Sequence, residues 1–310
     1  MKLQHYAPRA HRVAGANRSR ECAGRRFLNG GLTLLELLIV LALIPLAAVF
    51  FLACMQRQRG ETTVRVRCAS NLRQIGQAIL LYSNENGGAY PRTIYVVAPS
   101  VTPTWGTGAA ARDPFKEGGP APNDVTAALF LLLRTQDITS DVFTCPSSNA
   151  EKWDFGGAAN TALNWSNWEG REGIRKYLSY SFANPYPDAG IENKATTRPF
   201  LNNSISAEFA VASDINPGVS QGRGGVLSVT TQSSVRDMKA GNSPNHEGDG
   251  QNVLYGDGHV EFTQNPFVGV QRDNIFCRRA GASSLAPAPG PVAQSPYDIN
   301  DSVLLPAIDW

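Results

Sequence analysis

The chain of 310 residues lacks the short motifs that mark the common enzyme sites. It has no GxSxG nucleophile motif, no phosphate-binding glycine loop and no HExxH metal motif. Its five cysteines include no CxxC pair, and their spacing to the four histidines matches no zinc site. The spacing of its acidic residues does not fit an EF-hand calcium loop, and there is no internal repeat. We therefore predict that the protein is not an enzyme.

Basic residues are in excess only at the N-terminus. The formal net charge of the whole chain is +2, but the first 31 residues carry seven Lys and Arg against one Glu, a net charge of +6, which leaves −4 for the rest. A nucleic-acid-binding domain would carry its basic excess on the folded part. We therefore expect a basic leader and no nucleic-acid partner.

A long apolar run follows this leader. Residues 37–55 are nineteen uncharged residues, nearly all apolar, and about 20 are needed to span a bilayer as a helix. A secretory signal peptide has a shorter apolar region of about 7–15 residues and ends in a cleavage site of small residues. Here the run is longer and continues into MQRQRGETTVRVR without such a site. We predict a retained anchor with the leader in the cytoplasm, although five arginines at 57–73 lie on the side expected to be external.

The acidic residue Glu36 lies at the start of the apolar run, five residues after Gly31. In one interpretation it is a helix cap, because Thr33 and Glu36 fit the S/T-x-x-E capping box, and the helix dipole favours an acid there. In the other, the chain is cut between Gly31 and Leu32. The new amine of Leu32 then neutralises Glu36, within the chain or on a neighbouring copy, and sets the register between packed helices.

The segment GLTLLELLIVLALIPLAAVFFL resembles the cleavage and methylation signal of type IV prepilins and type II secretion pseudopilins. The resemblance implies that a prepilin peptidase cuts after Gly31 and methylates Leu32, and that Glu36 acts in assembly. It also implies a non-enzymatic structural subunit whose partners are other pseudopilins, the inner-membrane components of a secretion or pilus system, and the membrane. The protein would be a single-pass inner-membrane protein with a cytoplasmic N-terminus and a periplasmic globular part, or part of a filament or the cell surface.

Two later segments extend the resemblance. CASNLRQIGQAILLYSNENGGAYP resembles the segment after the anchor in pseudopilin-like proteins of planctomycete and verrucomicrobial bacteria. Those proteins carry a C-terminal processing-associated motif, a His followed nine residues later by Asp-Gly. In this chain ten residues separate His246 from Asp257-Gly258, which is one more than in that motif.

The pattern of apolar residues predicts an α+β fold: a long N-terminal helix, with a membrane-spanning first half, packed on a small antiparallel sheet with long loops, as in pilins. The helix should end near Glu85, and apolar residues form one stripe along its second half: Val64, Cys68, Leu72, Ile75, Ile79 and Tyr82. A buried helix is expected at 124–134 with Asn123 as its N-cap. Strands are expected at 176–182, 208–213, 225–230, 251–255 and 259–263, the last two joined by an Asp-Gly hairpin turn.

We expect five parts along the chain. They are a leader that is removed (1–31), the transmembrane or filament helix (32–55), its amphipathic continuation (56–88), a globular α+β domain (89–280), and a Pro/Ala-rich linker with a C-terminal tail (281–310).

Three cysteines fall in the exported part, Cys68, Cys145 and Cys277, which allows one disulfide and one free thiol. The sequence alone does not select the pair, and we favour Cys68–Cys145. No cofactor is expected. The oxygen ligands Glu247, Asp249 and Asp257 are a candidate calcium site, and the alternative for Asp257 is a purely structural role in the hairpin turn.

The loop at 150–172 holds three tryptophans, Trp153, Trp165 and Trp168. Such rings pack a loop onto its domain or stack on sugars. An anchored periplasmic or surface protein that binds polysaccharide and uses the same processing signal is therefore the alternative to a filament subunit.

Overall fold

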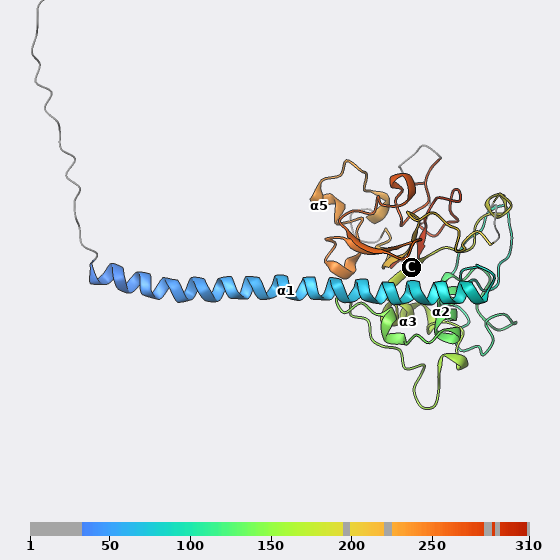
Figure 1. Ribbon diagram of the computed structural model, residues 1–310, viewed down its shortest axis with the longest axis horizontal. Helices are drawn as coiled ribbons and strands as arrows, with labels where there is room; N and C mark the ends of the chain where they lie inside the picture. The colour runs from blue at the N-terminus through green and yellow to red at the C-terminus, as the bar shows by residue number, and fades with distance from the viewer. Residues whose placement is uncertain (1–32, 195–198, 220–224, 282–286, 289–291, 309–310) are drawn as a thin grey trace, which may run out of the picture. The chain divides into compact units, whose positions relative to one another are not determined.

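A computed structural model provides the structure of the chain and describes residues 33–194, 199–219, 225–281, 287–288 and 292–308 (Figure 1). Side chains at 52–60 and 170–173 are outside this description. The chain divides into two units, Met1–Ala53 and Cys54–Trp310, and one helix, α1 (Leu34–Glu85, 52 residues), contributes to both.

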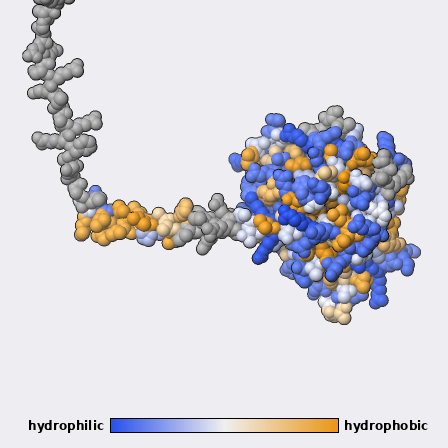
Figure 2. Space-filling view, in the orientation of Figure 1, coloured by the Kyte–Doolittle hydropathy of each residue, from blue (hydrophilic) through white to orange (hydrophobic). Residues whose placement is uncertain are grey.

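The described part of the first unit is the apolar half of α1. Leu34–Phe51 has a mean hydropathy of 2.8, none of it is buried, and it is long and apolar enough to cross a membrane (Figure 2). Thr33 and Glu36 form the capping box expected from the sequence. The Thr33 N–H donates to Glu36 Oε2 at 2.8 Å, and the Glu36 N–H donates to Thr33 Oγ1 at 3.2 Å.

In the second unit, α1 lies on the sheet through the predicted stripe. Four of the six stripe residues are buried and the other two pack against the core at its edges: Cys68, Leu72, Ile75 and Ile79, then Val64 and Tyr82. Gly76 lets the helix approach closely, because a Cβ at that position would lie 2.9 Å from Leu254 Cδ1. The helix ends where Gly87 and Gly88 adopt positive φ angles of 62° and 88°.

The sheet is antiparallel and has the strand order β4-β3-β2-β1-β5. Its strands are β1 (Tyr180–Ala183), β2 (Ala210–Asp214), β3 (Gln251–Tyr255), β4 (Val260–Thr263) and β5 (Leu304–Leu305). The predicted hairpin is present as β3 and β4, with Gln251 opposite Thr263. The described chain is thus α+β, with one apolar N-terminal helix and a small antiparallel sheet.

The second long helix is α2 (Val125–Thr135), at the predicted place and buried over Val125–Leu133. Its N-cap is Asp124, so the prediction of Asn123 is wrong. The Asp124 carboxylate accepts hydrogen bonds from Ala127 N–H at 2.8 Å and from Thr107 Oγ1 at 2.6 Å. Asn123 instead takes a positive φ of 64° and precedes the cap.

The remaining helices are short. They are α3 (Gly170–Tyr177), α4 (Ala189–Glu192), α5 (Val235–Met238), and the 3₁₀ turns η1 (Ser140–Phe143), η2 (Ala162–Asn164), η3 (Gly225–Leu227), η4 (Pro244–His246) and η5 (Val270–Arg272). The strand predicted at 225–230 is wrong, because that segment begins with η3. The strand predicted at 176–182 begins only at Tyr180, because residues 176–177 end α3.

The C-terminal tail is part of the globular domain and not a separate segment beyond residue 280. Its strand β5 pairs with β1, and residues 301–307 are all buried. The tail is fixed by Asp301, whose Oδ2 accepts the backbone N–H groups of Arg279 and Tyr297. Asp301 is buried close to Asp273. Burial and the neighbouring carboxylate raise the pKa of Asp273, and burial raises the pKa of Asp301.

Candidate functional site: a buried Cys–His–Asp cluster

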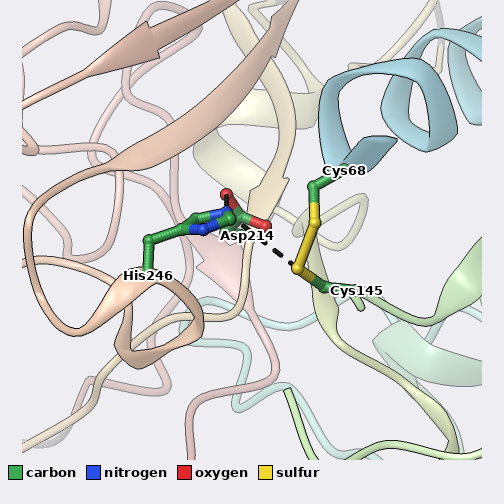
Figure 3. Close-up of side chains that lie close together, drawn as sticks. All are labelled: Cys68, Cys145, Asp214 and His246. Atoms are coloured by element: carbon green, nitrogen blue, oxygen red, sulfur yellow. Dashed lines mark hydrogen bonds and ion pairs between the residues drawn. A yellow bond between two sulfur atoms is a disulfide. The ribbon is translucent and has the colours of Figure 1, made fainter. Parts of the chain in front are cut away.

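Four chemically reactive side chains from distant parts of the chain meet beside the sheet (Figure 3). Cys68 is on α1, Cys145 follows η1, Asp214 ends β2, and His246 ends η4. One sulfur, nitrogen or oxygen atom from each residue lies within 4.8 Å of those of the other three. All four side chains are buried, with at most 1% of any residue exposed to solvent.

The two sulfurs are joined. Cys68 and Cys145 form a disulfide, which is the pairing favoured from the sequence, with a Cα–Cα distance of 5.3 Å and 77 positions between them in the chain. Cys277 is a free, buried thiol. The bridge ties α1 to the segment that follows η1.

His246 is placed by local turn chemistry. Pro244 begins η4, and the Ser243 side chain caps the turn by accepting the Asn245 N–H at 3.4 Å. The turn closes at Glu247, which adopts the left-handed conformation with φ 57°. This short turn directs the imidazole inward, so that His246 has no solvent exposure.

The imidazole lies between two carboxylates. His246 Nδ1 is 3.1 Å from Glu61 Oε1, and Nε2 is 3.2 Å from Asp214 Oδ2. Nε2 also lies 3.9 Å from Cys145 Sγ. Burial alone would lower the pKa of His246, but the hydrogen bonds and charges of Asp214 and Glu61 outweigh it, and the pKa is raised above its ordinary value. The Asn252 side-chain amide also lies 3.3 Å from Nε2.

Asp214 is held in place by two asparagines. Its Oδ2 accepts the Asn252 N–H at 2.6 Å and the Asn252 side-chain amide at 3.0 Å, and its Oδ1 accepts the Asn245 side-chain amide at 3.1 Å. Asn245 also donates to the Ser179 carbonyl at 2.8 Å. These bonds satisfy both oxygens of a carboxylate that has no access to water.

A serine lies at the edge of the cluster. Ser147 Oγ is 3.2 Å from His246 Nδ1, the nitrogen that also contacts Glu61 Oε1 at 3.1 Å. The disulfide leaves no thiolate at Cys68 or Cys145.

A cavity of about 370 Å³ borders the cluster. Ser147, which contacts His246, and Asn245, which contacts Asp214, both line it. The other lining residues are Ser148, Asn149, Arg175, Leu178, Ser179, Ile215, Pro244 and Ile308. The cavity thus gives solvent a route to the wall of the buried cluster.

The other predicted site residues do not gather here. Gly31 and Leu32 lie outside the described residues, and Glu36 caps α1. Within the C-terminal motif, His246 is buried in the cluster, whereas Asp257 is exposed at the β3–β4 turn and bonds His259 Nδ1 at 2.5 Å. That turn role is the structural alternative considered for Asp257, and Gly258 there has φ 87°.

The proposed calcium ligands are engaged elsewhere. Asp249 is paired with Arg65 at 3.2 Å and with Lys239 at 2.5 Å, and Asp257 is paired with His259. Among the residues that the structure describes, the group of Cys, His and acidic side chains close enough to hold a metal is the Cys–His–Asp cluster and not Glu247, Asp249 and Asp257. These contacts do not test calcium binding at those three residues, which stays a prediction from the sequence.

Glu61, Asp214 and the cluster itself were missed from the sequence. Glu61 and His246 are 185 positions apart, and Cys145 and His246 are 101 apart, so no local spacing marks them.

The comparison with protein-family models gave no match, and the comparisons with curated proteins and with solved structures gave none either.

Proposed function

We propose that this chain is a non-enzymatic structural subunit, a pseudopilin-like protein of a type II secretion or type IV pilus-like filament. A prepilin peptidase cuts after Gly31 and methylates the new N-terminus at Leu32. The subunit is then held in the inner membrane by α1 with its globular part in the periplasm. The observation that carries the proposal is the coincidence of Gly31, Glu36 and the apolar run behind a basic leader.

The exposure of the first half of α1 supports this proposal. Its large apolar residues are between 47% and 78% exposed from Leu34 to Phe51, on all sides of the helix. A helix that is apolar all round is stable only in lipid or among other apolar helices. A bilayer provides the first environment, and a bundle of identical helices in a filament provides the second.

Glu36 supplies the contact between subunits. In the described structure it caps its own helix through Thr33. After the cut, the new amine of Leu32 is four positions before Glu36 in the sequence and can neutralise Glu36 of its own chain or of a neighbouring copy. An ion pair in apolar surroundings fixes the register of packed helices, because an unpaired charge there is expensive.

The aromatic loop gives no support to polysaccharide binding. Trp153 and Trp168 are 1% and 0% exposed, and the Phe130 ring packs edge-on to Trp168 at 5.1 Å. Trp165 is partly buried against Trp153, with 5.3 Å between ring centroids. A ring must present a free face to stack on a sugar, and these rings use their faces in the core.

Processing is tested by substituting Gly31. In the native host, Gly31→Ala should leave the unprocessed precursor in the inner membrane, whereas the wild-type protein should begin at N-methyl-leucine 32 by mass spectrometry. Normal maturation of Gly31→Ala would overturn the proposed cleavage.

Assembly is tested by a matched pair of substitutions. Glu36→Val removes both the cap and the proposed contact between subunits, whereas Thr33→Val removes only the side-chain half of the cap. We expect Thr33→Val to enter filaments, as scored by cross-linking of copies, and Glu36→Val to be cleaved but excluded. Equal incorporation of the two variants would show that Glu36 is only a helix cap.

A further inference from the structure

The Cys–His–Asp cluster has the ligand set and the dimensions of a structural zinc site whose sulfurs are oxidised. We propose that Cys68, Cys145, Asp214 and His246 bind one zinc ion when the disulfide is reduced, so that the disulfide and the metal are alternative cross-links at the same place. This proposal does not depend on the proposed filament function, because it concerns the folded globular part alone.

The first argument for a zinc site is the set of distances between the ligand atoms. A tetrahedral zinc ion separates its ligands by about 3.8 Å for two sulfurs, about 3.5 Å for sulfur and nitrogen, and about 3.3 Å for nitrogen and oxygen. Here Cys145 Sγ lies 3.9 Å from His246 Nε2, and that nitrogen lies 3.2 Å from Asp214 Oδ2. The two bonded sulfurs must move apart, and all four ligand atoms lie within 4.8 Å of one another.

The second argument for a zinc site is that neighbouring side chains already orient the ligands. A zinc-bound histidine usually donates its other ring N–H to a carboxylate, which fixes its orientation. Glu61 accepts from His246 Nδ1 at 3.1 Å, which leaves Nε2 directed at the other three side chains (Figure 3). Asn245 and Asn252 hold the Asp214 carboxylate in the same way. Both non-sulfur ligands are thus already oriented.

Charge and burial select the metal. Thiolates disfavour calcium and magnesium, which take oxygen ligands, whereas two sulfurs with an imidazole and a carboxylate suit zinc. Four protein ligands leave no open position, so the ion would be structural and not catalytic. Arg65 pairs with Glu61 at 3.2 Å, which offsets the charge of the second carboxylate. The 370 Å³ cavity, lined by Ser147 and Asn245, provides the access route.

The disulfide form is converted to the zinc form in two steps, reduction and then metal binding. A dithiol reductant transfers two electrons and two protons to the disulfide, giving the Cys68 and Cys145 thiols and the disulfide of the reductant. Zinc then displaces both thiol protons and takes the place of any proton on His246 Nε2, and the displaced protons pass to water.

The test uses the full chain in detergent with Cys22, Cys54 and Cys277 all replaced by Ala, so that the cluster holds the remaining two thiols. The protein is reduced under anaerobic conditions and titrated with Zn²⁺ and, separately, with Co²⁺. We expect one ion per chain, a cobalt spectrum with thiolate charge-transfer bands and tetrahedral d–d bands, and a higher melting temperature of the reduced protein when zinc is present. The oxidised form of the same protein should bind neither ion.

Two variants sharpen the result. Asp214→Asn keeps the shape but removes the carboxylate charge, and should weaken zinc affinity at least tenfold. Glu247→Gln alters an acidic residue next to His246 that is not a proposed ligand, and should leave affinity unchanged. Because the reduced and oxidised forms of this three-alanine protein share one sequence, a folding defect in the Asp214 or Glu247 variant does not decide the outcome. Absence of stoichiometric zinc in the reduced chain, or equal binding by its oxidised form, would overturn the proposal.

Discussion

Removing the Cys68–Cys145 bridge should be among the most destabilising changes available in this chain. The bridge joins positions 77 apart, and closing a loop of that length lowers the entropy of the unfolded chain by about 15 cal/mol/K, or about 4.5 kcal/mol at 25 °C. In the double variant Cys68→Ala/Cys145→Ala, the small voids left in the core add about 1 kcal/mol. The total approaches the whole stability of many domains, about 5–15 kcal/mol.

The assay is urea unfolding of the full chain in detergent, with EDTA present so that no metal replaces the bridge. Fluorescence of the buried Trp153 and Trp168 reports the loss of the globular core. The midpoint of the double variant should fall strongly, and reduced wild-type protein should show nearly the same fall without any void. Cys277→Ala, a buried cysteine outside the bridge, should cost only about 1 kcal/mol. If the double variant unfolded at the wild-type midpoint, the loop-closure reasoning would be refuted.

Three further predictions concern the rest of the domain. Burial beside Asp301 raises the pKa of Asp273. The folded chain therefore holds a proton on Asp273 at pH values above about 4, where the unfolded chain has released it. The stability that this proton confers is therefore lost as the pH rises, and Asp273→Asn should flatten the decline in melting temperature between pH 5 and pH 9. Trp168→Ala should cost about 3–5 kcal/mol in urea unfolding, and the partly exposed Trp165→Ala clearly less; equal costs would contradict the packing described. Asp124→Ala should cost about 2 kcal/mol through loss of the α2 cap, and Asp124→Asn less, by the same assay.

The parts of the fold that the sequence predicts are those fixed by neighbouring residues. The stripe through Leu72 and Ile75 repeats with the helical period, so its burial follows from position on one helix. The Thr33–Glu36 capping box involves residues three apart, and the β3–β4 hairpin follows from an Asp-Gly turn between apolar runs. Each of these signals is contained in a short window of sequence.

The parts that could not be predicted depend on residues far apart in the chain. The β5 pair Leu304–Leu305 is too short for any periodic signal and is a strand only because β1 offers it a partner. The segment at 225–230 has strand-like composition, but its first three residues form the 3₁₀ turn η3, and it pairs with none of the five described strands. For the same reason, the absence of a CxxC pair gave no information on a site whose two cysteines lie 77 positions apart.

The cross-links between α1 and the globular domain are concentrated near one end of the packed half of the helix. Glu61 pairs with His246, Arg65 pairs with Asp249, and Cys68 is bonded to Cys145, all within eight positions of α1. Beyond them, toward Glu85, apolar contacts hold the helix, together with hydrogen bonds from Asn71 to Thr144 and Tyr180. Helices separate from their neighbours first at their ends, where the fewest contacts must break. In the proposed filament, any pull on the membrane half of α1 reaches the domain at this end first. A covalent bond and two ion pairs there would resist peeling of the helix from the sheet more effectively than the same bonds placed near Glu85.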